Sequence, residues 1–507
     1  MNGWDGREAA AGGSLRSSPA NNFGTEVIAR VLGNAATLLS GRVLGLALSA
    51  GASILLMRYL GSELAGTYAS LYAYLALFGW LAGFGLEAVV PREVAQRRDE
   101  AGMILTTGAV TGAVLSVFSL VAALSLAPFL GYQRSLSVLV LAAVEILGLP
   151  PLRLPGVVFQ VDLRQWYGVG IGLARQVVWL VAVVGLILLG APLRSIVLVR
   201  LVIAVVEVGV LLVATSGFVS RPWTFAMSEA KALLVYAYPV ALSTLAVGIY
   251  HRVDQVMIHK MLGDHVLGQY AASVNLAEPV SAVPVAVMAS LFPVLARAVD
   301  REETFSQYVA HGFRYLMFFI CACCVVIALA ASPIVHLLYG EEFRVSASML
   351  AVLTWSEIPV YAGVILTNAF IARGAQSYLP LATGVGAIAN LGLNLVLIPK
   401  YGGVGAAWAT VVSYWVASLL VFAVFRATRP LALVGVRATL LPSVLSVGVV
   451  VILNAVSLPV AMKVPVGLAA YCCGAAAVGA IGVRDFRAAR SLMGRVRTQI
   501  RPPLYKQ

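Results

Sequence analysis

The chain has 507 residues, of which 60% are hydrophobic and only 11% are charged, and its formal net charge is +13. This composition excludes a soluble globular protein, because too little polar surface is available to coat a fold of that size. The segments 101–133 and 315–340 contain no formal charge, and each is longer than the roughly 20 residues that cross a bilayer core. Such long runs, without alternating ten-residue strand patterns, favour transmembrane helices over a barrel.

Taken in order, the chain begins with a polar stretch, residues 1–27, that lacks the short apolar core of a signal peptide and is expected to stay in the cytosol. Fourteen spans are then predicted from the apolar runs. They are residues 28–57, 64–90, 103–130, 136–158, 166–190, 195–217, 232–260, 266–296, 312–338, 346–372, 379–399, 404–425, 438–460 and 464–483.

A repeated turn indicates that the chain is duplicated. The sequences LGSELAGTYA (60–69) and LGDHVLGQYA (262–271) match at five of ten positions, with an offset of 202 residues. Six spans separate the two copies, so both turns emerge on the same face, and the two halves are related by an axis along the membrane normal. The alternative is that Gly-rich turns recur by chance in a chain with 47 glycines.

This repeat predicts the domain organisation. We expect an N-lobe of six helices at 28–219 and a C-lobe of six helices at 231–426, joined by a cytosolic linker at 220–230. Two additional helices follow within 427–484. A basic tail at 485–507 has apolar residues at helical spacing, which is typical of a helix on the inner leaflet or of a solvated tail.

Lysine and arginine positions predict the orientation. With the N-terminus inside, 24 of the 35 basic residues fall on cytosolic tails and loops and seven on outer loops. Short basic loops favour the cytosolic side, so both termini are expected there. The same distribution explains the positive net charge, because the excess basic residues lie on loops that face anionic lipid of the cytosolic leaflet, and no nucleic-acid partner is needed.

Charged and polar residues inside the spans are the candidates for a binding cavity, because a charge at mid-bilayer costs at least about 2.5 kcal/mol without a partner or water. Arg42 and Ser49 share one face of the first span, and Tyr250 shares a face with Asp254 on the seventh. Arg252 points away from Asp254. Two positions stay open for its side chain, one in a cavity and one against the outer lipid headgroups.

Acidic residues near the middle of their spans are candidates for ion coupling. They are Asp254, Glu278 and Glu357. Glu207 follows Arg200 by seven residues, so a structural pairing of these residues, within a helix or between helices, stands beside a functional role. Arg175 is expected to extend towards the cytosolic interface rather than to contact a ligand.

The remaining polar and special residues have mainly structural interpretations. Asn368 and Asn390 suit either substrate contact or interhelical hydrogen bonds, as does Asn394, four residues after Asn390. Three prolines after Glu278 predict a kink in the eighth span. The five cysteines lie in apolar helix and are expected to pack there, and we predict neither a metal site nor a cofactor.

Several motifs resemble those of Wzx-type polysaccharide flippases, a family in the superfamily of MATE multidrug exporters and lipid II flippases. They are the two LGxxxxGxYA turns, LYGEEF at 338–343 and NLGLNLVLIPKYGGVGAA at 390–407. The resemblance covers about residues 28–426. It implies a V-shaped, MATE-like pair of six-helix lobes around a central cavity, with two additional C-terminal helices that form a lipid groove or flank the C-lobe.

The resemblance also implies a function. A transporter of this family moves an undecaprenyl-pyrophosphate-linked oligosaccharide from the cytosolic to the outer leaflet of a bacterial inner membrane, by alternating access. Arg42 and Arg252 are then the phosphate candidates, with coupling to H⁺ or Na⁺ left open. Expected partners are the lipid-linked oligosaccharide and membrane lipids, together with polysaccharide polymerase and glycosyltransferases.

Three alternatives stay open beside the flippase of polysaccharide units. A lipid II flippase shares the expected fold and the anionic substrate. A MATE-type multidrug antiporter also shares the fold but binds cations, so it needs an anionic, aromatic-lined cavity. A membrane glycosyltransferase or polymerase is disfavoured, since such enzymes usually carry catalytic carboxylates on a sizeable extramembrane loop.

Overall fold

The computed structural model describes residues 19–162, 164–219 and 223–478, and the regular secondary structure within these ranges is entirely helical. Within them, twelve helical stretches are long and apolar enough to cross a membrane. Two of these stretches, Gly41–Gln96 and Gln376–Val424, are much longer than one crossing. Each contains a glycine with non-helical backbone, Gly61 and Gly402, where the chain turns back. Counting both halves of each gives about fourteen crossings, as the sequence predicts.

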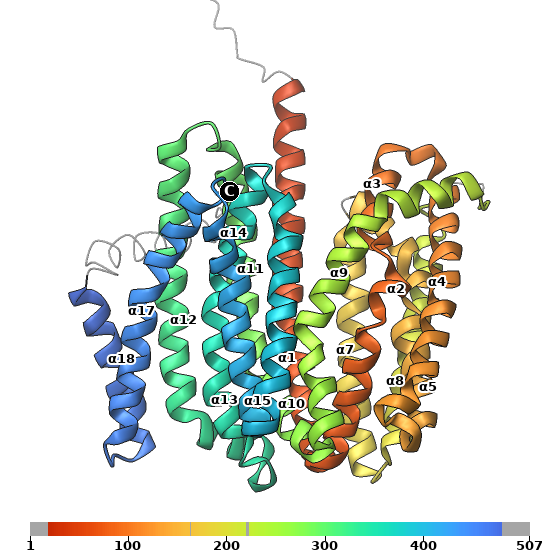
Figure 1. Ribbon diagram of the computed structural model, residues 1–507. Helices are drawn as coiled ribbons and strands as arrows, with labels where there is room; N and C mark the ends of the chain where they lie inside the picture. The colour runs from red at the N-terminus through yellow and green to blue at the C-terminus, as the bar shows by residue number, and fades with distance from the viewer. Residues whose placement is uncertain (1–18, 163, 220–222, 479–507) are drawn as a thin grey trace, which may run out of the picture.

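The first half of the chain forms most of the bundle on the right of Figure 1, while the long first part of α1 stands between the two bundles. Its helices are α1 (Pro19–Ala76), α2 (Gly79–Gly83), α3 (Leu86–Gln96), α4 (Ala101–Leu130), α5 (Leu136–Ala143), α6 (Val157–Val161), α7 (Gln165–Leu188) and α8 (Leu193–Thr215). A π-helical segment, Val144–Gly148, and a 3₁₀ segment, Pro150–Gly156, join α5 to α6, because Pro150 and Pro151 cannot continue an α-helical ladder.

Most of the second half forms the other bundle, with two more helices at its edge, while α9 runs along the first bundle (Figure 1). Its helices are α9 (Met227–Leu262), α10 (Asp264–Ala277), α11 (Ala282–Arg297), α12 (Glu302–Tyr339), α13 (Ser346–Leu353), α14 (Glu357–Ala372), α15 (Leu379–Trp415), α16 (Val421–Val424), α17 (Arg429–Ala455) and α18 (Val460–Ala477). A π-helical segment, Val416–Leu420, joins α15 to α16. Helices α17 and α18 pack on α12, outside the central region.

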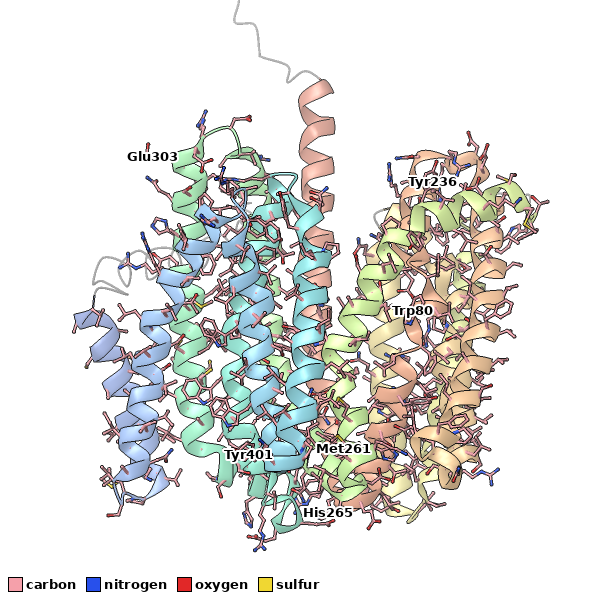
Figure 2. The ribbon with its side chains drawn as sticks, viewed as in Figure 1. Trp80, Tyr236, Met261, His265, Glu303 and Tyr401 are labelled. Carbon is pink, nitrogen blue, oxygen red and sulfur yellow. The ribbon has the colours of Figure 1, made fainter. Side chains whose placement is uncertain are left out.

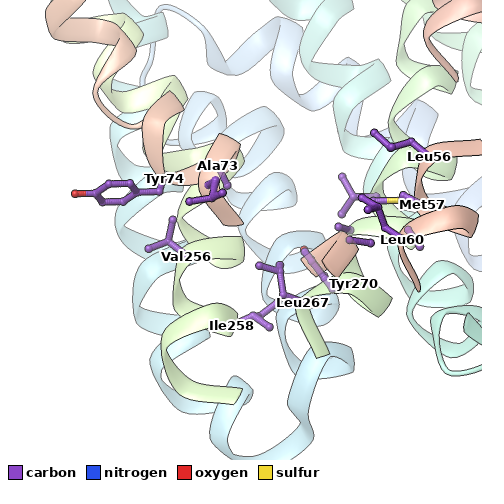
Figure 3. Close-up of a cluster of buried hydrophobic side chains, with 14 of the residues drawn as sticks. Leu56, Met57, Leu60, Ala73, Tyr74, Val256, Ile258, Leu267 and Tyr270 are labelled. Carbon is purple, nitrogen blue, oxygen red and sulfur yellow. The ribbon is translucent and has the colours of Figure 1, made fainter. Parts of the chain in front are cut away.

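The two bundles meet at the end where the repeated turns lie, which we call the turn end, and diverge towards the other end (Figure 1). A hydrophobic core fills the turn end and draws residues from both halves, including Leu56, Leu60, Val256 and Leu267 (Figure 3). These side chains are 8% exposed or less. Burial of apolar side chains from both halves therefore stabilises the contact between them.

Two glycines allow the close approach of α1 and α10 at the turn end. A Cβ added to Gly66 would lie 1.8 Å from the Asp264 carbonyl oxygen, and one added to Gly268 would lie 1.8 Å from the Ser62 carbonyl oxygen. Both distances are far inside van der Waals contact, so only glycine fits at either position. The two copies of the repeated turn thus pack reciprocally against each other.

Helix α9 spans the boundary between the two predicted lobes. Leu233 and Ala237, near its start, lie in a hydrophobic core with residues of α3 and α4 such as Val90 and Ile104. The later part of α9 packs on α15 of the second half. Close to the start of α9, Glu229 accepts hydrogen bonds from Arg97 at 2.5 and 2.9 Å. The first turns of α9 therefore belong structurally to the first bundle, although the predicted boundary assigns them to the C-lobe.

Some predicted boundaries differ from the structure. Helix α1 already begins at Pro19, inside the stretch that the sequence assigns to a polar tail, and α17 begins at Arg429 rather than near 438. The start of α1 is too polar to be recognised from hydropathy, and Arg429 and Arg437 interrupt the apolar start of α17. The predicted kink after Glu278 is confirmed, because a 3₁₀ segment, Glu278–Ser281, separates α10 from α11. The predicted basic tail at 485–507 lies outside the described residues.

Candidate functional site

Two adjacent cavities lie between the two halves of the molecule. The N-side cavity, of about 540 Å³, is lined mainly by α1, α7 and α8. The C-side cavity, of about 500 Å³, is lined mainly by α1, α9 and α10, with further residues from α14 and α15. The residues that line both form the partition between them, and they are Ser49, Ser53, Arg252, Gln255, Val274 and Asn275. Asn275 of α10 donates a hydrogen bond to Ser53 of α1 at 3.1 Å, which links the two halves within this partition.

The N-side cavity is cationic and aromatic. Arg175, Arg200 and Arg252 line it, and no described residue of its lining is a carboxylate. The aromatic members of the wall are Tyr68, Tyr72 and Trp179. Fixed arginines in a space withdrawn from water attract phosphate, because guanidinium groups can bind its oxygens in pairs.

Arg200 is held in place by a cage of side chains. Its Nε donates to Glu145 at 2.8 Å, Nη1 donates to the Tyr68 hydroxyl, and the guanidinium carbon lies 4.4 Å from the centroid of the Tyr72 ring. The Tyr72 hydroxyl donates to the other Glu145 oxygen at 2.8 Å. Glu145 belongs to the π-helical segment, where such irregularities are frequent at functional sites.

Arg200 and Glu207 do not pair with each other, and each forms an ion pair with another element, which is the interhelical form of the structural pairing. Glu207 accepts from Arg153 at 2.9 Å and lies 3.3 Å from the Nε of Arg175. The two residues share a helix, but each finds its partner on another one. Arg175 is also not directed to the interface as predicted, since it lies in the cavity wall beside Glu207.

The C-side cavity has the opposite charge. Its lining includes Asp254, Glu278 and Glu357, together with His251 and Arg252. Asp254 is buried and accepts hydrogen bonds from the Tyr270 hydroxyl at 2.5 Å and from the backbone N–H of Gln255 at 2.7 Å. Glu357 is 4% exposed, and its Oε2 has no hydrogen-bond partner among the described residues.

Arg252 belongs to both cavities. Its Nη2 lies 3.7 Å from the Oε2 of Glu278, on the 3₁₀ segment after α10. The two side chains are 36% and 44% exposed, so the pair lies at the cavity surface. The structure confirms that Arg252 does not pair with Asp254.

The turn end is closed by a polar network that crosses the two halves. Glu342 accepts from the backbone N–H and the hydroxyl of Ser62 at 2.6 and 2.9 Å, and that hydroxyl lies 2.8 Å from the Nδ1 of His265. The two hydrogen bonds from Ser62 lower the pKa of Glu342 below its ordinary value. Thr67 donates to Asp264 at 2.6 Å. Figure 2 shows His265 at this end of the molecule.

The other predicted site residues lie away from the cavity walls. Arg42 is exposed on α1, seven residues and about 10 Å before Ser49. Tyr250 stacks on Tyr414 with ring centroids 4.3 Å apart. Asn368 donates to a carbonyl of its own helix. Asn390 donates to Ser413 at 3.1 Å and is buried, which is the interhelical use that the sequence left open.

Sequence reasoning missed the aromatic side of the N-side cavity. Tyr68 and Tyr72 are four residues apart on α1, as are Arg175 and Trp179 on α7. That spacing places each pair on one helix face. This signal was available in the sequence, but the choice of partners across helices was not.

Comparison with known proteins identifies the family. A family model described as polysaccharide biosynthesis protein matches residues 55–348, which is more than half of the chain. The chain belongs to this family. It is similar to the probable low-salt glycan biosynthesis flippase Agl15 of Haloferax volcanii, with 23% identity over 194 residues that cover 38% of this chain and 41% of the relative.

Two further similarities concern a transporter sequence and a solved structure. The probable multidrug resistance protein NorM of Bacillus cereus is 29% identical over 179 residues, covering 33% of this chain and 39% of NorM. These sequence matches thus span about two fifths of each curated relative. The solved structure of the lipid II flippase MurJ in an inward closed conformation matches with a TM-score of 0.68 and 12% identity, over 88% of this chain and 98% of MurJ. This match confirms the predicted two-lobed fold of the superfamily.

Proposed function

We propose that this protein is a flippase that moves a lipid-linked oligosaccharide with an anionic phosphate headgroup across a membrane. The observation that carries the proposal is the N-side cavity, with three arginines in its wall and no carboxylate among the described lining residues. A charged headgroup enters hydrocarbon only where protein groups replace its water, and guanidinium groups do so for phosphate. Membership of the polysaccharide biosynthesis family supports the sugar part of the substrate.

The finer form of the proposal is an undecaprenyl-pyrophosphate-linked repeat unit, carried from the cytosolic to the outer leaflet of a bacterial inner membrane. The distribution of basic residues supports cytosolic termini, which makes the turn end the outer end. Trp179 also lines this cavity, and the face of its indole ring suits a sugar ring. A polysaccharide polymerase and glycosyltransferases are the proposed partners in the pathway.

Alternating access is the proposed mechanism. With the turn end closed by α1 and α10, the cavities between the diverging ends belong to the inward-facing state. A substrate or ion drives the switch only if it binds the two states unequally. The C-side carboxylates Asp254, Glu278 and Glu357 are the groups we propose for coupling to H⁺ or Na⁺. Arg42, which is exposed on α1 outside both cavities, is proposed to contact the substrate headgroup as it enters.

Reconstituted flipping tests this proposal. Proteoliposomes with a fluorescent polyprenyl-pyrophosphate-linked glycan report transfer between leaflets, and Arg175→Gln is expected to slow it about 10- to 100-fold, the usual effect of losing one charged hydrogen bond. Glu207 keeps Arg153 as a partner in this variant, so the fold should persist. Arg194→Gln, at an exposed position outside both cavities, is the charge-matched control. Equal rates for the two variants would remove Arg175 from the substrate path.

A cation antiporter is the second candidate, favoured by the carboxylates of the C-side cavity and by the similarity to NorM. It predicts export of ethidium from cells that express the protein, with loss in Asp254→Asn. The flippase proposal predicts no such export. Offering lipid II beside another lipid-linked glycan in the same liposomes separates a lipid II flippase from a carrier of polysaccharide units.

A further inference from the structure

Arg252 is the only arginine among the described lining residues that the two cavities share. Among the cavity arginines it also has the loosest partner. Arg200 is fixed by Glu145 and three aromatic rings, and Arg175 lies 3.3 Å from Glu207, whereas the Arg252–Glu278 distance is 3.7 Å between two partly exposed side chains. A pair of this kind contributes little and exchanges its partner easily.

Glu278 lies on a segment that can adjust its position. It opens the 3₁₀ turn between α10 and α11, where Pro279 interrupts the helical hydrogen bonding. The charged and titratable groups around it come from every neighbouring element. They are Arg252, His251 and Asp254 on α9, Tyr270 on α10, Glu357 on α14 and Tyr414 on α15. Arg252 supplies the fixed positive charge in this set, opposite three carboxylates.

We propose that Arg252 exchanges partners during transport, pairing with Glu278 in the empty protein and with the anionic headgroup when substrate occupies the N-side cavity. This inference rests on the proposed function and specifies how one residue connects the two cavities. Because Arg252 lines both, it needs a change of side-chain conformation rather than a movement of α9 to contact a ligand on the N side.

The exchange has an electrostatic consequence for the C-side cavity. Once Arg252 turns to the headgroup, Glu278, Asp254 and Glu357 face one another without their nearest positive charge. Like charges in a partly buried space repel and attract a compensating cation. Headgroup binding is therefore accompanied by uptake of a cation, either H⁺ or Na⁺. Arg252 thus acts as the positioning residue that links anion binding on one side to cation binding on the other.

Binding of undecaprenyl pyrophosphate to the purified full-length protein in nanodiscs tests the exchange. Glu278→Gln removes the competitor for Arg252 and is expected to tighten binding about 3- to 5-fold, the range for a partly exposed ion pair. Arg252→Gln is expected to weaken binding. The double variant should bind like Arg252→Gln alone, because Glu278 has no competing role once Arg252 is absent. Glu303→Gln removes a negative charge far from the cavities and serves as the control (Figure 2).

A second readout separates the cation sources. If the cation is H⁺, the affinity of the wild type for undecaprenyl pyrophosphate is expected to fall as pH rises at constant Na⁺. If the cation is Na⁺, the affinity is expected to rise with Na⁺ concentration at constant pH. Glu278→Gln should weaken whichever of these two dependences occurs. If the wild type binds the probe but Glu278→Gln binds no tighter than Glu303→Gln, the exchange is wrong and the proposed function stands. If the wild type does not bind the probe, the proposed function fails and the exchange fails with it.

Discussion

The charged residues of this protein fall into two groups. Some have a hydrogen-bond partner in the fold for every polar atom, and others can still accept or donate further hydrogen bonds. Glu145 is 6% exposed and accepts from both Arg200 and Tyr72, so neither of its oxygens lacks a donor. Breaking a pair like this one is strongly destabilising, because it leaves a buried charge without compensation. By contrast, Arg252 and one oxygen of Glu357 retain capacity towards a cavity. Spare hydrogen-bonding capacity, rather than charge alone, is therefore what makes these two residues candidates for ligand binding.

Glu342 at the turn end allows a prediction at the residue scale. Its carboxylate accepts two hydrogen bonds from Ser62, with His265 next to the same hydroxyl, and these lower its pKa from the ordinary 4.5. A lowered pKa in the closed state means that the carboxylate stabilises closure at every pH above the ordinary value, and that this contribution disappears as pH falls through the lowered one. Glu342→Gln should therefore reduce the closed fraction at pH 7.

Spin labels at the exposed positions Glu63 and Met261, in a background without native cysteines, measure that closed fraction as a distance distribution. The closed fraction of the wild type should fall only below about pH 4.5. The closed fraction of Glu342→Gln should already be low at pH 7 and should change little below about pH 4.5. His265 also faces this network, so Ser62→Ala is the comparison that removes the hydroxyl contacts with Glu342 and His265 and keeps the backbone hydrogen bond. An unchanged distance distribution in Glu342→Gln at pH 7 would show that the carboxylate does not hold the turn end closed.

Which residues pair could not be predicted from the sequence, and the reason is visible at Arg200. Periodicity places Arg200 and Glu207 on one face of α8, but the nearest carboxylate in space is Glu145, 55 residues earlier. Partner choice depends on how helices are rotated against each other, which no single span encodes. The sequence did identify Arg252 and the three C-side carboxylates as intramembrane groups, since their cost in lipid is a local property.

The sequence was most informative about the number and position of the helices. Apolar length fixed the number and approximate position of the crossings, and the prolines after Glu278 marked the break between α10 and α11. Hydropathy failed at the beginnings of α1 and α17, and at the first turns of α9, which pack on the opposite half. These features depend on contacts between helices rather than on the composition of one.

The crossing of α1 and α10 gives a prediction at the scale of elements. Gly66→Ala would place a methyl group 1.8 Å from the Asp264 carbonyl oxygen, which forces the two helices apart. Overpacking of this kind costs about 1 to 3 kcal/mol, so the closed turn end should lose about 5- to 150-fold in population. Flipping in proteoliposomes should slow accordingly. Gly51→Ala in the same helix meets no atom within 4 Å and should leave the rate unchanged. Equal rates for the two would contradict a role for this contact in the cycle.

At the scale of the whole molecule, the closed turn end is expected to be one of two states that the protein must visit. The halves meet there through a hydrophobic core and the polar network, and they diverge at the other end. A covalent bond across the contact should therefore trap the cavities in one facing. Thr67 and Asp264 suit this test, because their side chains are 2.6 Å apart and belong to different halves.

In a background with the five native cysteines replaced, Thr67→Cys combined with Asp264→Cys should form a disulfide on oxidation and stop flipping, and reduction should restore it. Each single variant controls for loss of the native hydrogen bond and for oxidation itself. Headgroup binding separates trapping from misfolding, since a protein locked with its cavities accessible should still bind undecaprenyl pyrophosphate while failing to move it. Continued flipping by the fully cross-linked protein would mean that the halves need not part at this end, and alternating access around this contact would have to be abandoned.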